Sequence, residues 1–470
     1  MMKKLFRFLP AVDACLKALA EALPACATAP RPLVRHLVNA FLDSQRELVQ
    51  QGLLDDPVAL ALPGSLPALC AFVERGLRPR LRPVLNGTGV VIHTNMGRSL
   101  LCRAAQQAVA RAASSYCNLE LDLRTGERGS RHSIVEEKLC LLTGAEAALA
   151  VNNNAAAVLL ILDTLCKGRE IIVSRGQLVE IGGSFRIPEI MQCSGALLRE
   201  VGTTNRCHLH DYAGAINENT AALLRVHSSN FRIVGFFKEV GLPELVRLGR
   251  EHGLPLIEDL GSGSLIDFAP FGLPGEPTVQ SVVAEGADLV CFSGDKVLGG
   301  PQAGLVVGRR ELVDRLRSNP LQRALRLDKL SLAALEATLH VYLDPRAALE
   351  QIPTAAMLSA TPEKLAQRAR RLATRLRRSL GEKARTSIAK NVSRAGGGSF
   401  PERDLPTSLV CIEPVTCTAE SLKLGLLAGE PPLLGRLENN CFCLDPRTLA
   451  DSDFAEVARL VSLALVARSE

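Results

Sequence analysis

The first 67 residues have the hydrophobic spacing of helices. Val12, Leu16, Leu19 and Leu23 recur at intervals that place them on one helical face, and Pro10 can occupy the first turn. A second helix is predicted over 33–49, where two neighbouring apolar rows run along one face: Leu33, Leu37 and Phe41, and Val34, Val38 and Leu42. Strand signals are few, so 1–67 is predicted to form a helical domain.

The pattern changes after a basic segment that contains prolines. We predict a linker over 68–85, because the two prolines of RPRLRPVL disfavour helix. From residue 86, short apolar runs alternate with helical patterns; the runs include 148–151, 170–173, 222–226, 255–257, 289–292 and 304–307. This alternation predicts an α/β domain over 86–340 with a mostly parallel sheet, whose ligands bind at the carboxyl ends of the strands.

The last part of the chain is predicted to form a smaller α/β domain, 341–470. Residues 363–385 read as an amphipathic helix with a basic outer face and an apolar stripe of Leu365, Leu372, Leu376 and Leu380. A strand follows at 408–415.

Charge and composition narrow the classes of function. Up to residue 82 the chain has eleven basic and seven acidic side chains, so this part holds four of the six net positive charges. That asymmetry favours an anion-binding appendage, although a solvated helical face accounts for it as well. Aromatic residues are only 4%, with no Trp, which argues against base-stacking platforms.

The cysteines and the apolar stretches favour a cytoplasmic protein. The 14 cysteines are scattered without a CxxC pair, as expected for small apolar residues in a reducing compartment. No clean apolar stretch is long enough for a membrane span. The basic start resembles a signal peptide, but Arg7, Asp13 and Lys17 interrupt its apolar region.

The strongest chemical signal is a lysine at the end of an apolar strand. The run 287–292 leads into SGDK at 293–296, and GGP at 299–301 forms the next turn. A lysine desolvated in a glycine-lined crevice has a lowered pKa and can form a Schiff base with an aldehyde cofactor. A solvated lysine in a turn is the alternative.

Two other strand ends can complete a cofactor site. Asp259, which is nearer the strand exit than Glu258, can face a pyridinium nitrogen; a magnesium ligand or a helix cap is the alternative. The run VNNNAAA at 151–157 joins a strand to a helix whose free N–H groups can bind phosphate, although asparagine also caps helices without a ligand. The motifs GxGxxG, GxxxxGK[ST] and HExxH are missing, so we expect no metal.

Several long motifs in one order resemble the bacterial selenocysteine synthase family, the L-seryl-tRNA(Sec) selenium transferases. The resemblance covers nearly the whole chain, including the helical start and PPLLGRLENNCFCLDPRTL. Its motifs are NGTGVVIHTNMGR at 86–98, VNNNAAAVLL at 151–160, SRGQLVEIGGSFRIP at 174–188, EVGTTNR at 200–206, DLGSGSL at 259–265 and SGDKVLGGPQAG at 293–304. It implies pyridoxal phosphate, the aspartate-aminotransferase-like type I fold and a ring of dimers, a decamer.

The resemblance also assigns site residues. Lys296 becomes the Schiff-base lysine, with Asp295 beside it, and Asp259 the pyridinium partner. The other cofactor-binding residues are Asn153, Asn154 and Ala155 near the phosphate, Asn230 near the ring, and Ser293. The basic N-terminal helices match a tRNA-binding domain.

Three arginines match those that this family uses around the phosphate of the selenium donor: Arg98, Arg323 and Arg326. The spacing of the last two predicts one shared helical face. Pairing with nearby carboxylates such as Asp328 is the alternative.

The implied reaction converts seryl-tRNA(Sec) to selenocysteinyl-tRNA(Sec) with selenophosphate, by β-elimination through an aminoacrylyl-tRNA intermediate and selenium addition. Two other functions remain open. A pyridoxal-phosphate β-eliminating lyase or desulfurase acting on a free amino acid shares the lysine but needs no basic appendage. A tRNA-binding protein with a degenerate cofactor site would not be expected to keep SGDK and DLGSGS intact.

Overall fold

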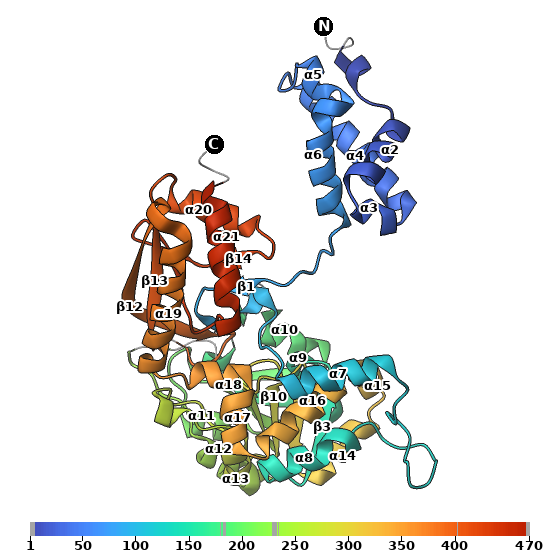
Figure 1. Ribbon diagram of the computed structural model, residues 1–470. Coiled ribbons are helices and arrows are strands. Elements are labelled where there is room, and N and C mark those ends of the chain that lie inside the picture. Colours follow the sequence, from blue (N-terminus) through green and yellow to red (C-terminus); the bar gives the residue numbers. More distant parts are fainter. Residues whose placement is uncertain are drawn as a thin grey trace. The chain divides into compact units, whose positions relative to one another are not determined.

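The computed structural model describes residues 5–178, 180–181, 185–227, 233, 235–401 and 403–466, and the chain divides into two compact units, Met1–Pro83 and Val84–Glu470 (Figure 1). Each unit has its own hydrophobic core. No helix of the described part is long and apolar enough to cross a membrane.

The N-terminal unit is helical. Its core is formed by Cys15, Leu19, Val34, Val38, Phe41, Leu42, Leu69 and Val73. The two predicted helices are confirmed as α2 and α4, but the predicted domain end at residue 67 falls inside α6, whose Leu69 and Val73 are fully buried in that core. The unit therefore continues to Pro83. Its elements are η1 (Phe6–Phe8), α2 (Val12–Ala22), α3 (Ala25–Thr28), α4 (Arg31–Gln50), α5 (Pro57–Leu60) and α6 (Leu62–Leu77).

The second unit is built around a seven-stranded sheet of order β3-β11-β10-β9-β8-β4-β7, parallel except for β11. Six strands confirm the six predicted runs. The seventh, β7, is an edge strand whose largely exposed residues give no buried-strand pattern. The strands are β3 (Ala147–Val151), β4 (Glu170–Ser174), β7 (Leu197–Val201), β8 (Thr220–Val226), β9 (Leu256–Gly261), β10 (Leu289–Ser293) and β11 (Gly304–Gly308).

Helices cover both faces of this sheet. Alternate residues of β3 enter two different cores: Ala148 and Ala150 join one, and Leu149 and Val151 the other. The surrounding elements are η2 (Thr94–Met96), α7 (Arg103–Ser114), α8 (Ser133–Thr143), α9 (Asn154–Leu165), η3 (Arg175–Gln177), β5 (Glu180–Ile181), β6 (Phe185–Arg186), α10 (Ile187–Cys193), α11 (Leu209–Ala215), α12 (Leu242–His252), η4 (Ala269–Phe271), α13 (Val279–Glu285), α14 (Arg310–Ser318), α15 (Leu321–Leu325), α16 (Lys329–Tyr342), α17 (Pro345–Gln351) and α18 (Pro353–Leu358).

A smaller five-stranded sheet, β15-β16-β13-β12-β2, follows in the C-terminal part. Its strand β2 comes from residues 90–92, which the sequence pattern assigned to the larger domain, and pairs in parallel with β12. The predicted apolar stripe of α19 is confirmed as buried. The elements are β1 (Leu85–Asn86), β2 (Val90–Ile92), α19 (Pro362–Leu380), η5 (Gly381–Lys383), β12 (Ala384–Gly396), β13 (Leu405–Pro414), α20 (Ala419–Leu427), β14 (Leu433–Leu434), β15 (Arg436–Glu438), β16 (Cys441–Leu444), η6 (Asp451–Asp453) and α21 (Phe454–Val466).

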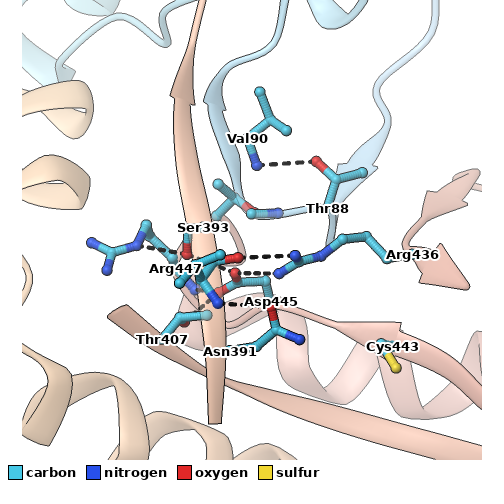
Figure 2. A network of polar contacts seen from close by, with 12 residues as sticks. Thr88, Val90, Asn391, Ser393, Thr407, Arg436, Cys443, Asp445 and Arg447 are labelled. Carbon is cyan, nitrogen blue, oxygen red and sulfur yellow. Dashed lines mark hydrogen bonds and ion pairs between the residues drawn. The ribbon is translucent and has the colours of Figure 1, made fainter. Parts of the chain in front are cut away.

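A buried aspartate joins the NGTG loop, residues 86–89, to this sheet (Figure 2). Asp445 is fully buried, and its backbone N–H donates to Gly87 O at 2.8 Å. Its carboxylate accepts four hydrogen bonds of 2.7–2.9 Å, from the side chains of Ser393, Thr407 and Arg436 and from the Arg447 N–H. A Cβ on Gly89 would lie 2.1 Å from this carboxylate, so the loop needs glycine there. The network fixes the start of the segment that carries Arg98.

Removing the carboxylate should destabilise the protein strongly. Asp445→Ala leaves three buried donors and the partly buried Arg436 guanidinium without their acceptor, and we expect a loss of about 3–5 kcal/mol, measured as a lower Tm. The matched control is Asp404→Ala, since Asp404 pairs with Arg394 and both side chains are about half exposed. It should cost about 1 kcal/mol or less. Equal effects of the two variants would contradict the role of Asp445.

Candidate functional site

Three neighbouring parallel strands end at one edge of the large sheet. Val226, the last residue of β8, is in register with Asp259 of β9, which is in register with Cys291 of β10. The chain therefore brings His227, Asp259 and Lys296 to the same edge. Parallel α/β sheets bind their ligands at this edge.

The turn that carries Lys296 is fixed by backbone hydrogen bonds. Gly294 N–H donates to Ala303 O at 2.9 Å, and Val297 N–H to Ser262 O at 3.2 Å. A Cβ on Gly294 would lie 2.7 Å from Pro301 O, so the tight turn needs glycine. Ser293, at the end of β10, is buried. The predicted strand-to-lysine turn is therefore confirmed.

The Lys296 amine lies among charged groups. Burial lowers its pKa, and the nearby Arg98 guanidinium adds to that effect. Asp259, Asp295 and Glu276 oppose it, because negative charge favours the ammonium. A lysine in this setting releases its proton more readily than a solvated one and can act as a nucleophile or a base.

Asp259 is held in position by two donors. Asn154 Nδ2 donates to its Oδ1 at 2.8 Å, and Gly261 N–H donates to the same oxygen at 3.0 Å. Burial raises the pKa of Asp259, while these hydrogen bonds and Lys296 favour the ionised form. Glu258 lies on the other face of β9, where Arg225 pairs with it at 2.6 Å. The strand alternation thus places Asp259 and Glu258 on opposite faces of β9, and Asp259 is the one on the side of Lys296.

Two asparagines of the run 152–154 have different roles. Asn153 caps α9, since its Oδ1 accepts the Ala156 N–H at 2.9 Å, while Asn154 reaches Asp259. A Cβ on Gly304 would lie only 2.0 Å from Asn153 O, so a glycine lets β11 pack against this turn. Asn154 and Ala155 are partly exposed at the start of the helix, where the first backbone N–H groups of a helix have no intrahelical acceptor. The first turn of α9 can therefore accept an anionic ligand.

The three arginines occupy different surroundings. Arg98 Nη1 donates to Asp295 Oδ2 at 2.7 Å, beside Lys296, and Arg326 lies 3.6 Å from Glu120 Oε1. Arg323 is exposed, and of the three arginines Arg98 is the one whose charge acts on the Lys296 amine. The predicted shared helical face is wrong, because α15 ends at Leu325 and Arg326 is extended.

Two of the three arginines therefore pair with carboxylates, Arg98 with Asp295 and Arg326 with Glu120. Asp328, the carboxylate suggested by the sequence, is not one of the partners. That residue caps α16 by accepting the N–H groups of Leu330 and Ser331. Asn230 lies outside the described residues.

Sequence reasoning missed a buried pair, Glu276 and His227. Glu276 accepts a hydrogen bond from Ser262 Oγ, and its Oε1 lies 3.9 Å from His227 Nδ1, a buried atom without a partner. Burial raises the pKa of Glu276 to about 7 and lowers that of His227 to about 4. Glu276 stands in an irregular loop before α13, where no periodic pattern indicates burial.

Comparisons with known proteins agree with the motifs. The family described as L-seryl-tRNA selenium transferase matches residues 84–450, and that described as selenocysteine synthase N terminal matches 6–46. The chain is 64% identical over 467 residues to the L-seryl-tRNA(Sec) selenium transferase of Nitratidesulfovibrio vulgaris, covering 99% of this chain and 100% of that one. The Desulfovibrio desulfuricans protein of the same name is 59% identical over 99% of both chains.

A solved structure shows the fold. The structure of D-glucosaminate-6-phosphate ammonia-lyase superposes with a TM-score of 0.58 and 21% identity, covering 83% of this chain and 97% of that one. The expected type I fold is confirmed. Among the described residues, no group of three His, Cys, Asp or Glu side chains could hold a metal ion.

The raised pKa of Glu276 predicts a pH-dependent stability. The folded protein holds this proton up to a pKa of about 7, against 4.5 for an ordinary glutamate. Stability from the neutral carboxyl is full below about pH 4.5 and is lost as the pH rises through about 7. The unfolding free energy of cofactor-free wild type, relative to that of Glu276→Gln, should therefore fall by at most about 3 kcal/mol from pH 5 to pH 8, measured as a fall in the Tm of wild type relative to the variant.

The control for this measurement is Glu285→Gln, at the exposed end of α13. It should follow the wild type at both pH values. A Tm difference for Glu276→Gln that is constant over this range would show that Glu276 is ionised throughout.

Proposed function

Because this chain belongs to the L-seryl-tRNA selenium transferase family, we propose that its crevice binds pyridoxal 5′-phosphate at Lys296 and there replaces the serine hydroxyl of seryl-tRNA(Sec) by selenol. The enzyme converts seryl-tRNA(Sec) to selenocysteinyl-tRNA(Sec), with selenophosphate as the selenium donor and pyridoxal phosphate as cofactor. The observation that carries the site assignment is the desolvated Lys296 amine beside the fixed carboxylate of Asp259.

The residues present fit this cofactor. Lys296 would bind its aldehyde carbon, and Asp259, held by Asn154 and Gly261, would face its ring nitrogen. The first turn of α9, at Asn154 and Ala155, would receive the phosphate. When bound, the cofactor supplies an electron sink for the negative charge at the substrate α carbon.

The protein contributes proton transfer and orientation. With its lowered pKa, Lys296 can accept the α proton at Nζ. Arg98 holds Asp295 at 2.7 Å and so fixes the residue before the lysine. For Asp259 to pair with the ring nitrogen, its carboxyl must be ionised. The hydrogen bonds from Asn154 and Gly261 favour this ionised form.

We assign the phosphate of selenophosphate to Arg98, Arg323 and Arg326. Arg98 lies beside Lys296, and the backbone of Arg326 pairs with Val151, next to the asparagine run. Guanidinium groups bind tetrahedral oxyanions through paired donors.

In the transfer assay below, Arg323→Ala should keep the cofactor absorbance and lose activity mainly at low selenophosphate concentration.

The tRNA is assigned to the N-terminal unit. Three of its exposed cations, Lys17, Arg31 and Arg75, have no carboxylate partner among the described residues, whereas Arg35 pairs with Asp13 at 3.0 Å. Unpaired cations on a compact helical unit are available to phosphates.

The proposal includes a cytoplasmic homo-oligomer, a decamer built as a ring of dimers. Exposed apolar side chains around the 120–128 hairpin support self-association, since Tyr116 and Leu123 have relative exposures of 105% and 73%.

The test of the function uses seryl-tRNA(Sec), selenophosphate and pyridoxal phosphate. Wild type should give selenocysteinyl-tRNA, identified by mass after deacylation. Lys296→Ala should lose both transfer and the visible absorbance of the cofactor, since the substitution removes the amine that is assigned to bind it. Borohydride should trap the cofactor on the peptide of Lys296. An adduct on Lys238 or Lys329, or turnover of free serine but not of seryl-tRNA, would contradict the proposal.

The tRNA assignment predicts a charge effect confined to the N-terminal unit. The triple variant Lys17→Ala, Arg31→Ala, Arg75→Ala should weaken tRNA binding at least tenfold and flatten its salt dependence, because fewer counterions are released. Arg35→Ala is the matched control and should change binding little, since Asp13 already neutralises that charge. Unchanged affinity of the triple variant, with normal cofactor absorbance, would place the tRNA elsewhere.

A further inference from the structure

We propose that Cys411 and Cys443 form a redox modification site, a dithiol that a hydroperoxide closes to a cross-strand disulfide. The two residues are directly opposite each other in the antiparallel pair β13–β16. Their Sγ atoms are 3.2 Å apart. No other two cysteine thiols of the described chain are in hydrogen-bond contact.

The two thiols lie on the face of the small sheet that is turned away from the core around α19 and α21. Residues Val410, Ile412, Phe442 and Leu444 alternate with the two cysteines and belong to the core that also contains buried side chains of α19 and α21. The thiols therefore lie on the opposite face of the sheet. A disulfide needs a sulfur separation of about 2.05 Å, so the thiols must approach by only about 1.2 Å.

The two thiols differ in access and in acidity. Cys411 has a relative exposure of 9% and Cys443 of 1%, so a small oxidant reaches Cys411 first. The Cys443 thiol donates to Cys411 Sγ, which lowers the pKa of Cys411, and Arg436 acts in the same direction. The thiolate is the reactive form of cysteine, so Cys411 is the nucleophile and Cys443 resolves the product.

The chemistry balances with a hydroperoxide as oxidant. Cys411 thiolate attacks one peroxide oxygen, the O–O bond breaks, and Cys411 becomes a sulfenic acid while hydroxide, or alkoxide, leaves. Cys443 sulfur then attacks the sulfenic sulfur, and the S–O bond breaks. The oxygen leaves as water, with the thiol proton. Two thiols lose two electrons, and the peroxide gains two.

The bridge would act next to the Asp445 network. Cys443 and Asp445 lie on the same face of the chain segment 441–445, and Cys443 is beside the network in Figure 2. Arg436 contacts both groups, because it pairs with Asp445 at 2.9 Å and is opposite Cys443 in the β15–β16 register. Oxidation would therefore stiffen the strands that hold the NGTG loop.

The experiment treats the full-length protein with hydrogen peroxide, blocks free thiols with iodoacetamide and maps tryptic peptides without reduction. The expected product links peptide 404–423 to peptide 437–447 through Cys411 and Cys443, with a mass lower by two hydrogens. Alkylation of the two cysteines should fall at one common rate, and dithiothreitol should restore both.

Cys441→Ser and Cys417→Ser are the matched controls, since both cysteines lie in the same two peptides. Both variants should still form the bridge, whereas Cys411→Ser and Cys443→Ser should not. The proposal is overturned if the wild-type link runs through Cys441 or Cys417. It is equally overturned if Cys411 and Cys443 stay alkylatable while the exposed Cys117 and Cys193 are oxidised.

Discussion

The site depends on one electrostatic constraint: burial disfavours the charged forms of both Lys296 and Asp259, and each of the two groups favours the charged form of the other. Asp259 lies on β9, and Lys296 lies in the turn that follows the adjacent parallel strand β10. Asn154, at the start of α9, donates a hydrogen bond to Asp259. A charge buried without a partner costs several kcal/mol. Separating the segments that carry Lys296, Asp259 and Asn154 would therefore be unfavourable. Gly294 lets the backbone of the lysine turn approach Pro301, and Gly304 lets β11 approach Asn153, so both glycines keep these segments close together.

The smaller sheet extends this constraint to a distant segment of chain. Asp445 holds the NGTG loop, the loop continues into β2 and η2, and Arg98 then reaches Asp295 beside the lysine. The C-terminal sheet therefore supports the segment that carries Arg98 to the site.

The sequence predicted most of the fold and the centre of the site for physical reasons. Six strands were found because they are buried on both faces and read as apolar runs, and Lys296 and Asp259 were found because each follows such a run. Local patterns could not show that residues 90–92 pair with a strand near residue 394, or that α6 continues past residue 67. The burial of Glu276 and the separate roles of Asn153 and Asn154 arise from tertiary contacts, which spacing does not encode.

The pairing of Val90 with Arg394 has a consequence for how the chain folds. The strand partner of β2 ends at Gly396, and the other strands of the small sheet run on to Leu444, so β2 can pair only after the strands of the large sheet have been synthesised. The β12–β13 hairpin is local and can form first, with one edge open until β2 docks. Docking joins two segments about three hundred residues apart in the sequence, and until then the open edge can pair with another chain. Because β2 is continuous with the segment that carries Arg98, its docking also brings Arg98 to Asp295, beside the lysine.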